Sequence, residues 1–486
     1  MKTLRELLIG GDVLKVHGDV NIPVSGIAYN SQHVRPGFCF MAIKGFVCDG
    51  LEFVPDAVRR GARAVVSMHP PLPELANVAW VQVKNDRHAL SHLAARFYDN
   101  PSQRLTVVGV TGTNGKTTTV HLIADLLNRE SKTARIGTLG MDFSGLAQPV
   151  SLTTPEAPEL FQFMAQVEAA GGVNLVMEVS SSSLSLHRVT DINFSQAVFT
   201  SFSGDHLDFH GSMERYFQAK LSLFKKLSPE NWAVINVDDP MAPALIGELN
   251  CQYLTFGFSP QADIRPLKYK LTLPGINAQL QTPKGKLEFD CPLAGRFNLA
   301  NIMAAVGSAL VKGVSGEQIA AALKSFQPVK GRVNVAYAGD FQVIVDYAHT
   351  DDALKNLLQS LKEIISGRII LVFGAGGCRD KTKRPRMGQV ASQLADVVAV
   401  TSDNPRQEEP QAIIQDVVAG MEPGFKAVQI EADRRQAIGR AIDLAKKGDL
   451  VVIAGKGHED YQIFKDRRIH FDDFEVVREK MRGRNA

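Results

Sequence analysis

The sequence predicts an α/β protein of three domains: a small N-terminal α/β domain, a central P-loop domain on a parallel sheet, and a C-terminal Rossmann-like domain. The chain has 486 residues, which is enough for about three domains. Short β-branched runs alternate with helix-patterned stretches, as is typical of parallel sheets covered on both faces. One of these runs leads into a glycine loop that ends in Lys-Thr, and such loops belong to phosphate-binding sheets.

The expected elements follow this alternation along the chain. We predict domains at 1–100, 101–330 and 331–486, with the first boundary at the turn signal Asn100-Pro-Ser. In the first domain we expect strands at 37–43 and 62–67 and a helix at 86–98. The central strands are expected at 105–110, 175–179, 197–200 and 232–237. The last domain repeats the pattern, with strands at 343–345, 369–373, 397–400 and 450–453.

Composition excludes several classes of protein. The net charge is only +3, so a general attraction to nucleic acid is not expected. Five scattered cysteines without a C-x-x-C pair fit a reducing compartment and argue against a disulfide framework or a structural zinc. No apolar run reaches the ~18 residues of a membrane span. We therefore expect a cytoplasmic protein that binds small molecules rather than nucleic acid or membranes. We also expect a monomer, although no feature of the sequence specifies the oligomeric state.

A phosphate-binding loop is the strongest local signal. It comprises Gly112, Thr113, Asn114, Gly115, Lys116, Thr117 and Thr118. Glycines let backbone N–H groups surround an anion, and the following helix, expected from the apolar pattern at 120–127, adds its positive N-terminus. Lys116 is expected to reach the outer phosphates of ATP, and the Thr117 hydroxyl to bind Mg²⁺. Val110 occupies the position of the usual first glycine, so the loop is a variant.

Three further side chains could hold a metal beside this loop. Glu178 follows an apolar strand, and a carboxylate at the mouth of such a sheet suits Mg²⁺; the alternative is a salt-bridged or capping glutamate. His206 lies after the next strand, where it could join the metal or form part of a capped turn. Lys220 lies among aromatic residues and could snorkel to solvent. Alternatively it could be a desolvated neutral amine that CO₂ converts into a carbamate.

The C-terminal domain carries two more motifs after strands. In Asp403-Asn404-Pro405-Arg406, Arg406 could bind a carboxylate through two hydrogen bonds, although a turn with a surface arginine has the same pattern. The loop from Gly455 to Glu459 adds a carboxylate. The segment after the strand at 369–373 resembles a dinucleotide fingerprint but has Arg379 where that fingerprint requires a third glycine, so NAD is not expected.

Taken in order, these motifs resemble the Mur ligase family of ATP-dependent amide-forming enzymes over nearly the whole chain. The matching segments are Gly112-Thr-Asn-Gly-Lys-Thr-Thr118, Glu178-Val-Ser-Ser, Asp205-His-Leu-Asp-Phe-His-Gly, Gly295-Arg-Phe-Asn-Leu-Ala-Asn301, Gly331-Arg332, Asp346-Tyr-Ala-His349 and Gly455-Lys-Gly-His-Glu459. Asp403-Asn-Pro-Arg406 is similar to the signature of the members that add meso-diaminopimelate.

The resemblance implies ATP and Mg²⁺ as cofactors, and UDP-N-acetylmuramoyl-L-alanyl-D-glutamate and meso-diaminopimelate as substrates. It implies four catalytic residues, which are Lys116, Glu178, His206 and Lys220. The metal ligands would be Thr117, Glu178, His206 and Lys220, and Lys220 would be carbamylated. Asn298, Arg332, Asp346 and His349 would join the loop around ATP. The UDP-linked dipeptide would contact Ser31, Phe46, Val47, Cys48, Thr153, Thr154, Ser180, Leu186 and Arg188. The diaminopimelate pocket would comprise Arg379, Asp403, Asn404, Pro405, Arg406, Gly455 and Glu459.

Some positions depart from the family pattern. They are Gln32, Ser182, Leu186, Asn334 and Asp351, and they bear on individual dipeptide and hinge contacts. Two rivals remain in the same class, a lysine-adding ligase and a folylpolyglutamate-type synthetase. Arg406 argues against lysine, which has no distal carboxylate. A rival from another class is a P-loop ATPase whose hydrolysis drives motion or partner binding.

Overall fold

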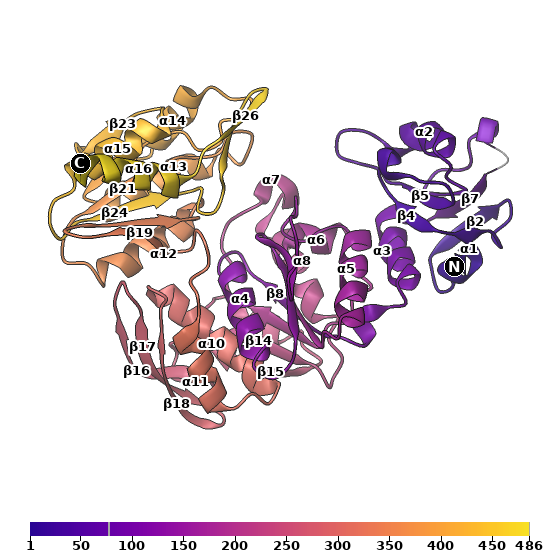
Figure 1. The fold of residues 1–486 in the computed structure, drawn as a ribbon, viewed down its shortest axis with the longest axis horizontal. Coiled ribbons are helices and arrows are strands. Elements are labelled where there is room, and N and C mark those ends of the chain that lie inside the picture. The colour runs from indigo at the N-terminus through magenta and orange to yellow at the C-terminus, as the bar shows by residue number, and fades with distance from the viewer. Residues whose placement is uncertain (76–77, 486) are drawn as a thin grey trace.

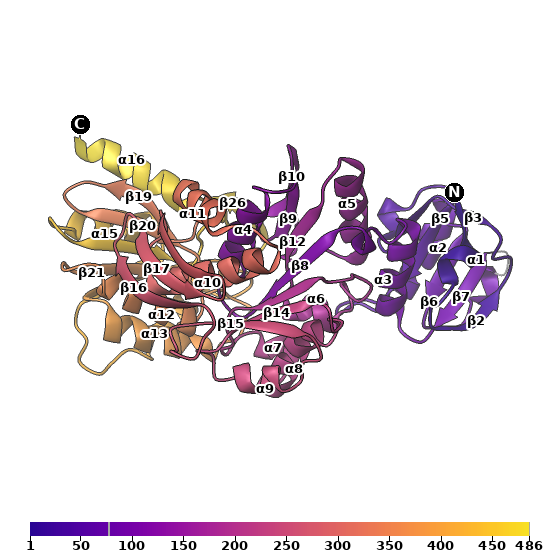
Figure 2. The ribbon, with the colours of Figure 1, turned by 90° about the horizontal axis from the view of Figure 1, so that it is seen from below.

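The computed structural model describes residues 1–75 and 78–485. They form three α/β domains in a row, with the two termini at opposite ends of the elongated molecule (Figures 1 and 2). Each domain is built on its own mainly parallel sheet, which confirms the predicted fold class. In the described part of the chain, no helix is long and apolar enough to cross a membrane.

The N-terminal domain has a five-stranded sheet in the order β2-β7-β6-β5-β4. Its strands are β2 (Val13–His17), β4 (Gly26–Ala28), β5 (Phe38–Ala42), β6 (Ala64–Ser67) and β7 (Ala79–Val83). The short pair β1 (Lys2–Thr3) and β3 (Pro23–Val24) lies beside it. The helices are α1 (Leu4–Leu8), α2 (Val54–Arg59) and α3 (Asp86–Phe97). The side chain of Asn85 caps α3 by accepting hydrogen bonds from two backbone N–H groups, which fixes where this helix begins.

The middle domain has an eight-stranded sheet in the order β11-β10-β9-β12-β8-β13-β14-β15. Its strands are β8 (Thr106–Thr111), β9 (Thr133–Gly137), β10 (Gly140–Phe143), β11 (Leu146–Gln148), β12 (Asn174–Glu178), β13 (Gln196–Phe199), β14 (Trp232–Asn236) and β15 (Gln252–Phe256). Strands β9 to β15 along this order are parallel. The phosphate loop and Glu178 therefore lie at the same edge, because they end the neighbouring strands β8 and β12.

Helices cover both faces of this middle sheet. They are α4 (Lys116–Leu127), α5 (Ala157–Ala169), α6 (Ser181–Ser185), α7 (Leu207–His210), α8 (Met213–Phe224), α9 (Ala242–Ile246), α10 (Arg296–Val311) and α11 (Gly316–Ser325). Alternate residues of a strand enter opposite cores: Val108 and Val110 pack with α4 and α10, and Val107 packs with α5 on the other side. Continuous apolar strands are expected where both faces are buried.

An antiparallel sheet of three strands was missing from the sequence-based expectations. It comprises β16 (Arg265–Leu271), β17 (Ile276–Thr282) and β18 (Gly285–Cys291). Its inner face carries Ile276, Ala278 and Leu280, which alternate with more exposed residues and pack on the core around α10 and α11. This period of two is the usual signal of a half-buried strand.

The C-terminal domain has a six-stranded sheet in the order β19-β20-β24-β21-β22-β23. Its strands are β19 (Asn334–Ala338), β20 (Gln342–Asp346), β21 (Ile369–Phe373), β22 (Val397–Val400), β23 (Val428–Ile430) and β24 (Leu450–Ala454). The helices are α12 (Asp351–Lys362), α13 (Lys383–Leu394), α14 (Pro410–Val418), α15 (Arg434–Leu444) and α16 (Asp473–Asn485). A hairpin, β25 (Tyr461–Phe464) and β26 (Arg467–His470), follows β24. The edge strand β19 runs antiparallel to its neighbour, whereas β20 to β24 are mutually parallel.

A fully buried ion pair ties this last sheet to its final helix. Arg434 and Asp473 are both solvent-inaccessible and share two hydrogen bonds of 2.8 Å, while Arg434 also donates to the carbonyl of Ala454 at 3.0 Å. Arg434→Met should cost about 3–5 kcal/mol, because it leaves the Asp473 carboxylate buried without its counter-charge. Hydrogen exchange of β24 and α16, followed by mass spectrometry, should become faster.

The adjacent residue offers a matched control for that prediction. Arg435 pairs with Glu479 on the surface, where both side chains are more than half exposed. Arg435→Met should change stability by at most about 1 kcal/mol, because exposed pairs contribute little. Equal effects of the two substitutions would contradict the structural role assigned to Arg434.

Candidate functional site

The phosphate loop has the geometry expected of an anion cradle. It joins β8 to α4, and α4 begins at Lys116 rather than near Val120, where the apolar pattern starts. Gly115 has φ +85°, and a Cβ at this position would lie 2.5 Å from the side-chain oxygen of Asn301. Glycine is therefore required both by conformation and by space. Lys116 Nζ donates to the carbonyls of Gly112 and Thr113 at 2.8 and 2.9 Å, and burial lowers its pKa.

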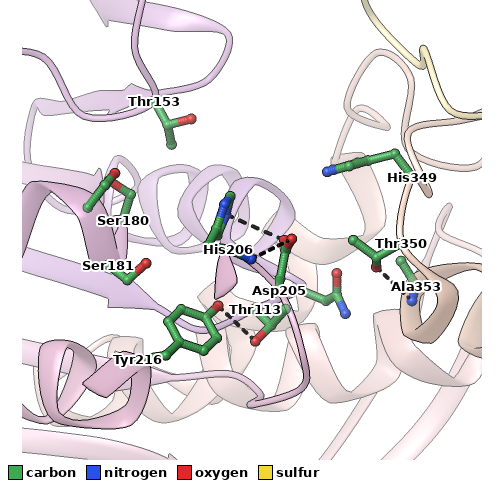
Figure 3. A network of polar contacts seen from close by, with 12 residues as sticks. Thr113, Thr153, Ser180, Ser181, Asp205, His206, Tyr216, His349, Thr350 and Ala353 are labelled. Carbon is green, nitrogen blue, oxygen red and sulfur yellow. Dashed lines mark hydrogen bonds and ion pairs between the residues drawn. The ribbon is translucent and has the colours of Figure 1, made fainter. Parts of the chain in front are cut away.

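The loop is supported from two sides. On one side, the Thr113 hydroxyl lies 3.1 Å from the Tyr216 hydroxyl of α8 (Figure 3). On the other, Asn301 of α10 accepts a hydrogen bond from Thr119 at 3.3 Å and donates to Asn298 at 3.1 Å. Asn298 itself is buried and donates to the carbonyl of Ala294 at 2.7 Å. Asn298 therefore orients Asn301 in this structure. A contact between Asn298 and adenine stays a prediction.

The predicted metal-binding side chains lie beside this loop. Glu178 is 1% exposed and accepts hydrogen bonds from the backbone and hydroxyl of Thr138 at 2.8 and 3.3 Å. His206 has φ +54°, and its Nε2 lies 3.4 Å from an oxygen of Asp205 (Figure 3). Burial lowers the pKa of His206, which favours the neutral ring that a metal requires.

Lys220 is buried rather than solvated. It is 1% exposed, and its Nζ lies 4.5 Å from the centre of the Tyr216 ring. Burial, followed by the charge of Lys116, lowers the pKa of Lys220 well below its ordinary value. The snorkelling alternative is therefore wrong for this lysine. A neutral amine is the form that can react with CO₂, so the carbamylation hypothesis keeps its chemical basis.

A second polar cluster lies at the carboxyl ends of β22 and β24 in the C-terminal domain. Asn404 donates to Glu459 at 2.8 Å and accepts a hydrogen bond from the backbone of Ile463 at 3.0 Å. Arg406 has φ +55°, and its guanidinium donates to the carbonyl of Gly377 at 2.9 Å. This contact holds the charged group in place while leaving its other N–H groups available. Asp403 lies on the same loop, with one carboxylate oxygen buried and without a hydrogen-bond partner among the described residues.

A buried arginine and a partly exposed glutamate join the loops of this cluster. Arg384 of α13 is 1% exposed, and its two terminal nitrogens donate to the two carboxylate oxygens of Glu408 at 2.8 and 2.9 Å. Glu408 also accepts a hydrogen bond from the backbone of Cys378 at 2.5 Å. The loop after β21 and the loop after β22 are thereby joined, which keeps Arg379 and Arg406 on one side of the domain.

The residues predicted to bind the UDP-linked dipeptide fall into two groups. Arg188 bonds Glu156 at 2.9 Å and the carbonyl of Thr154 at 3.1 Å. Thr153, Ser180 and Arg188 face the cavity described below, whereas Thr154 is buried and Leu186 ends α6. The second group, Ser31, Phe46, Val47 and Cys48, belongs to the N-terminal domain, where the Phe46 ring lies 5.9 Å from the Phe209 ring of the middle domain.

The middle and C-terminal domains meet at the phosphate loop. Arg332 donates to the Thr117 hydroxyl at 3.1 Å, and Asp352 accepts hydrogen bonds from Asn114 and Ser203, each at 2.8 Å. Asp346 fixes the segment next to Arg332, because its carboxylate accepts hydrogen bonds from the backbone N–H groups of Ala348 and Val333 at 2.7 and 2.9 Å. Burial raises the pKa of Asp346 and lowers that of His349 to about 4. His349 faces Asp205 and His206 across the interface (Figure 3).

One cavity of about 1530 Å³ connects these parts. Its lining includes Lys116, Thr117, Glu178, His206 and Lys220 from the middle domain. From the C-terminal domain it includes Arg332, Asp346, His349, Arg379, Asp403, Asn404, Arg406, Gly455 and Glu459. Eight predicted residues are not among those that line it in the described part of the chain: Asn298, Pro405, Thr154 and Leu186, and the N-terminal Ser31, Phe46, Val47 and Cys48. Most of the predicted site is thus brought to a single space between two domains.

Four participants were missed by reasoning from the sequence. Asp352, Tyr216, Arg384 and Lys456 all hold site residues in place. Lys456 lies inside the matched segment Gly455–Glu459, and Asp352 lies three residues after the matched segment Asp346–His349. Their position in or near a motif could have identified these two residues from the sequence. Tyr216 and Arg384 carry no such signal, because their contacts span long stretches of chain.

The fold and the cavity are those of a P-loop protein whose phosphate loop shares one cavity with a polar cluster on a separate domain. Models of the Mur ligase middle domain, the Mur ligase glutamate ligase domain and the Mur ligase family catalytic domain match residues 110–309, 331–457 and 23–98, respectively. The chain belongs to the Mur ligase family, as the motifs indicated.

Named relatives agree over the full length. The chain is 46% identical to the UDP-N-acetylmuramoyl-L-alanyl-D-glutamate–2,6-diaminopimelate ligase of Gloeobacter violaceus, over 96% of this chain and 95% of the relative. It is 43% identical to the protein of the same name from Solibacter usitatus, over 95% and 94%. A solved structure of a ligase with that name superposes with a TM-score of 0.70 at 31% identity, over 100% of this chain and 99% of the other.

Proposed function

We propose that this chain is an ATP-dependent ligase that joins meso-diaminopimelate to the D-glutamate of UDP-N-acetylmuramoyl-L-alanyl-D-glutamate, in the synthesis of peptidoglycan precursors. The observation that carries the proposal is the single cavity shared by the phosphate loop and the loop of Asp403, Asn404 and Arg406. Full-length similarity to ligases of that name supports it. Because one chain completes the cavity, we propose that the protein acts as a monomer. We also propose that it acts in the cytoplasm, and that its domain boundaries lie near residues 100 and 330.

The first step that this geometry supports is activation of a carboxylate. An oxygen of the D-glutamyl carboxylate attacks the γ-phosphorus of ATP, the bond to the β-phosphate oxygen breaks, and ADP leaves. Lys116 and the N-terminus of α4 would stabilise the negative charge on the transferred phosphoryl group. Arg332 already reaches Thr117 from the other domain, so it would close the nucleotide side of the cavity.

The residues around Lys220 fit a magnesium site in which the phosphates of the bound nucleotide supply the remaining ligands. No group of three or more His, Cys, Asp or Glu side chains is arranged for a metal within residues 1–75 and 78–485. Protein Mg²⁺ sites commonly use one or two carboxylates together with substrate phosphates. Thr117, Glu178, His206 and a carbamylated Lys220 would hold the ion. When bound, it would withdraw charge from the γ-phosphate.

The second step joins the amine to the activated carbon. The free amine of diaminopimelate attacks the acyl carbon, the C–O bond to the phosphate breaks, and the nitrogen loses a proton. The C-terminal pocket would orient the amino acid for this attack, and positioning of this kind can supply much of the acceleration. Closure of the domain around α12 and α13 should keep water from the acyl phosphate.

Phosphate release with a panel of amino acids tests the proposal. With ATP, Mg²⁺ and the UDP-linked dipeptide present, release should require an amino acid and be fastest with meso-diaminopimelate. Phosphate release that requires neither the UDP-linked dipeptide nor an amino acid would instead favour a P-loop ATPase. Fastest release with lysine would favour the lysine-adding type.

Arg406 is expected to select the amino acid. Its guanidinium is held by the Gly377 carbonyl and can pair with the distal carboxylate of diaminopimelate, which lysine lacks. Loss of such a pair costs roughly 2–5 kcal/mol, or about 30-fold to several thousand-fold. Arg406→Ala should therefore reduce kcat/KM for diaminopimelate by that factor while ATP binding is kept. An unchanged preference for diaminopimelate over lysine in the variant would remove Arg406 as the selector.

A further inference from the structure

Lys456 is a fully buried cation behind the C-terminal pocket. Its Nζ lies 3.1 Å from Glu459, 3.4 Å from the side-chain oxygen of Asn404 and 3.6 Å from Asp403. It also lies 5.4 Å from the centre of the Tyr461 ring. Buried lysines are rare unless paired, and these three polar partners all belong to the amino-acid pocket. The position therefore points to a role in that pocket.

The contacts make Lys456 the partner of both pocket carboxylates. Its ammonium approaches Asp403 and Glu459 from the protein side, while both carboxylates also line the cavity. One lysine charge offsets one of these two negative charges. A single negative charge is then left for a cation in the cavity, and the guanidinium of Arg406 is available for an anion.

We propose that Lys456 is a specificity-determining residue that sets the charge of this pocket to match a head group carrying both an ammonium and a carboxylate. The proposal rests on the proposed function, because diaminopimelate carries such a zwitterionic head at its far end. Lysine carries only an ammonium there. With lysine bound, the remaining negative charge pairs with its ammonium, but the guanidinium of Arg406 is left without an anion, and burying an uncompensated charge is costly. Lys456 thus acts through Asp403 and Glu459 without reaching the substrate.

A series of three variants tests the charge rule. Relative to the wild type, Lys456→Met makes the pocket more negative by one charge, Glu459→Gln makes it more positive by one, and the double variant restores the balance. The measured quantity is the ratio of kcat/KM for meso-diaminopimelate to that for lysine. We expect Lys456→Met to lower this ratio by about tenfold or more, Glu459→Gln to keep or raise it, and the double variant to return it to within about threefold of the wild type.

Two controls separate charge from loosened structure. Arg384→Met removes the buried cation that joins the neighbouring loops but leaves Asp403, Glu459 and Lys456 intact. Because Arg384 also holds the loop of Arg406, this variant should weaken the use of both amino acids and lower the ratio, but Glu459→Gln should not restore the ratio in Arg384→Met as it does in Lys456→Met. Lys447→Met replaces an exposed lysine shortly before β24 and should change neither value.

The outcomes distinguish this inference from the proposed function. A wild-type protein inactive with both amino acids would overturn the function itself. A wild type that prefers diaminopimelate, combined with an unchanged ratio in Lys456→Met or with equal restoration of the ratio by Glu459→Gln in Arg384→Met, would overturn only the role of Lys456. If Lys456→Met does not fold, the ratio measured in Glu459→Gln is the test. A lower ratio in Glu459→Gln than in the wild type would contradict the proposal.

Discussion

Lys116→Ala is expected to abolish amide formation, with a loss of at least about a thousandfold in kcat. The side chain is the cation of a loop whose backbone and helix N-terminus already surround an anion. Without it, the charge that develops on the transferred phosphoryl group is not neutralised. The fold should persist, because the lysine contributes only two hydrogen bonds to loop carbonyls. Product formation by mass spectrometry and thermal unfolding measure the two effects.

Lys132 provides the control for this substitution. It is an exposed lysine shortly after α4, so Lys132→Ala should leave both kcat and the unfolding temperature unchanged. Normal amide formation by Lys116→Ala would contradict the assignment of the phosphate loop.

Lys220→Ala is the second substitution with a large expected effect. If Lys220 carries a carbamate, its loss removes a negatively charged metal ligand, and kcat should fall by at least about a hundredfold. Short carboxylic acids such as acetate should restore part of the activity by occupying the space of the carbamate. The buried position beside Tyr216 and the lowered pKa of the amine supply the physical basis.

A carbamate can be observed directly. Protein equilibrated with ¹³C-labelled CO₂ should show one carbamate resonance that is absent from Lys220→Ala. Lys225→Ala is the matched control, because Lys225 follows the same helix and forms an exposed ion pair with Glu248 at 2.9 Å. Full activity in CO₂-depleted buffer without a carbamate resonance would contradict the modification.

The parallel sheets could be predicted because their strands are buried on both faces. The run at 105–110 predicted β8, which spans Thr106–Thr111, and the run at 369–373 coincides with β21. The start of α4 was placed too late, because its first turn is polar and faces the loop, so the apolar periodicity begins only at Val120. The sheet of β16 to β18 was missed although β17 alternates regularly.

The candidate site was predictable where a residue lies in a motif at the end of a strand. Glu178, Arg406 and Lys116 are of this kind, and the structure brings them to one cavity. Contacts across the domains were not predictable, since Asn114 and Asp352 are joined only when two separate sheets meet. Lys456 was overlooked for a different reason. A lysine is ordinarily solvated, and only the fold shows that this one lies beneath two carboxylates.

Transfer of an oxygen atom tests the central claim most directly. The UDP-linked dipeptide is prepared with ¹⁸O in both positions of its D-glutamyl carboxylate and incubated with ATP, Mg²⁺ and meso-diaminopimelate. If the carboxylate attacks the γ-phosphorus and the amine then displaces phosphate, each released phosphate carries one ¹⁸O and the amide product keeps the other. Phosphate that contains no ¹⁸O would mean that water attacks ATP, and would contradict the proposed ligase.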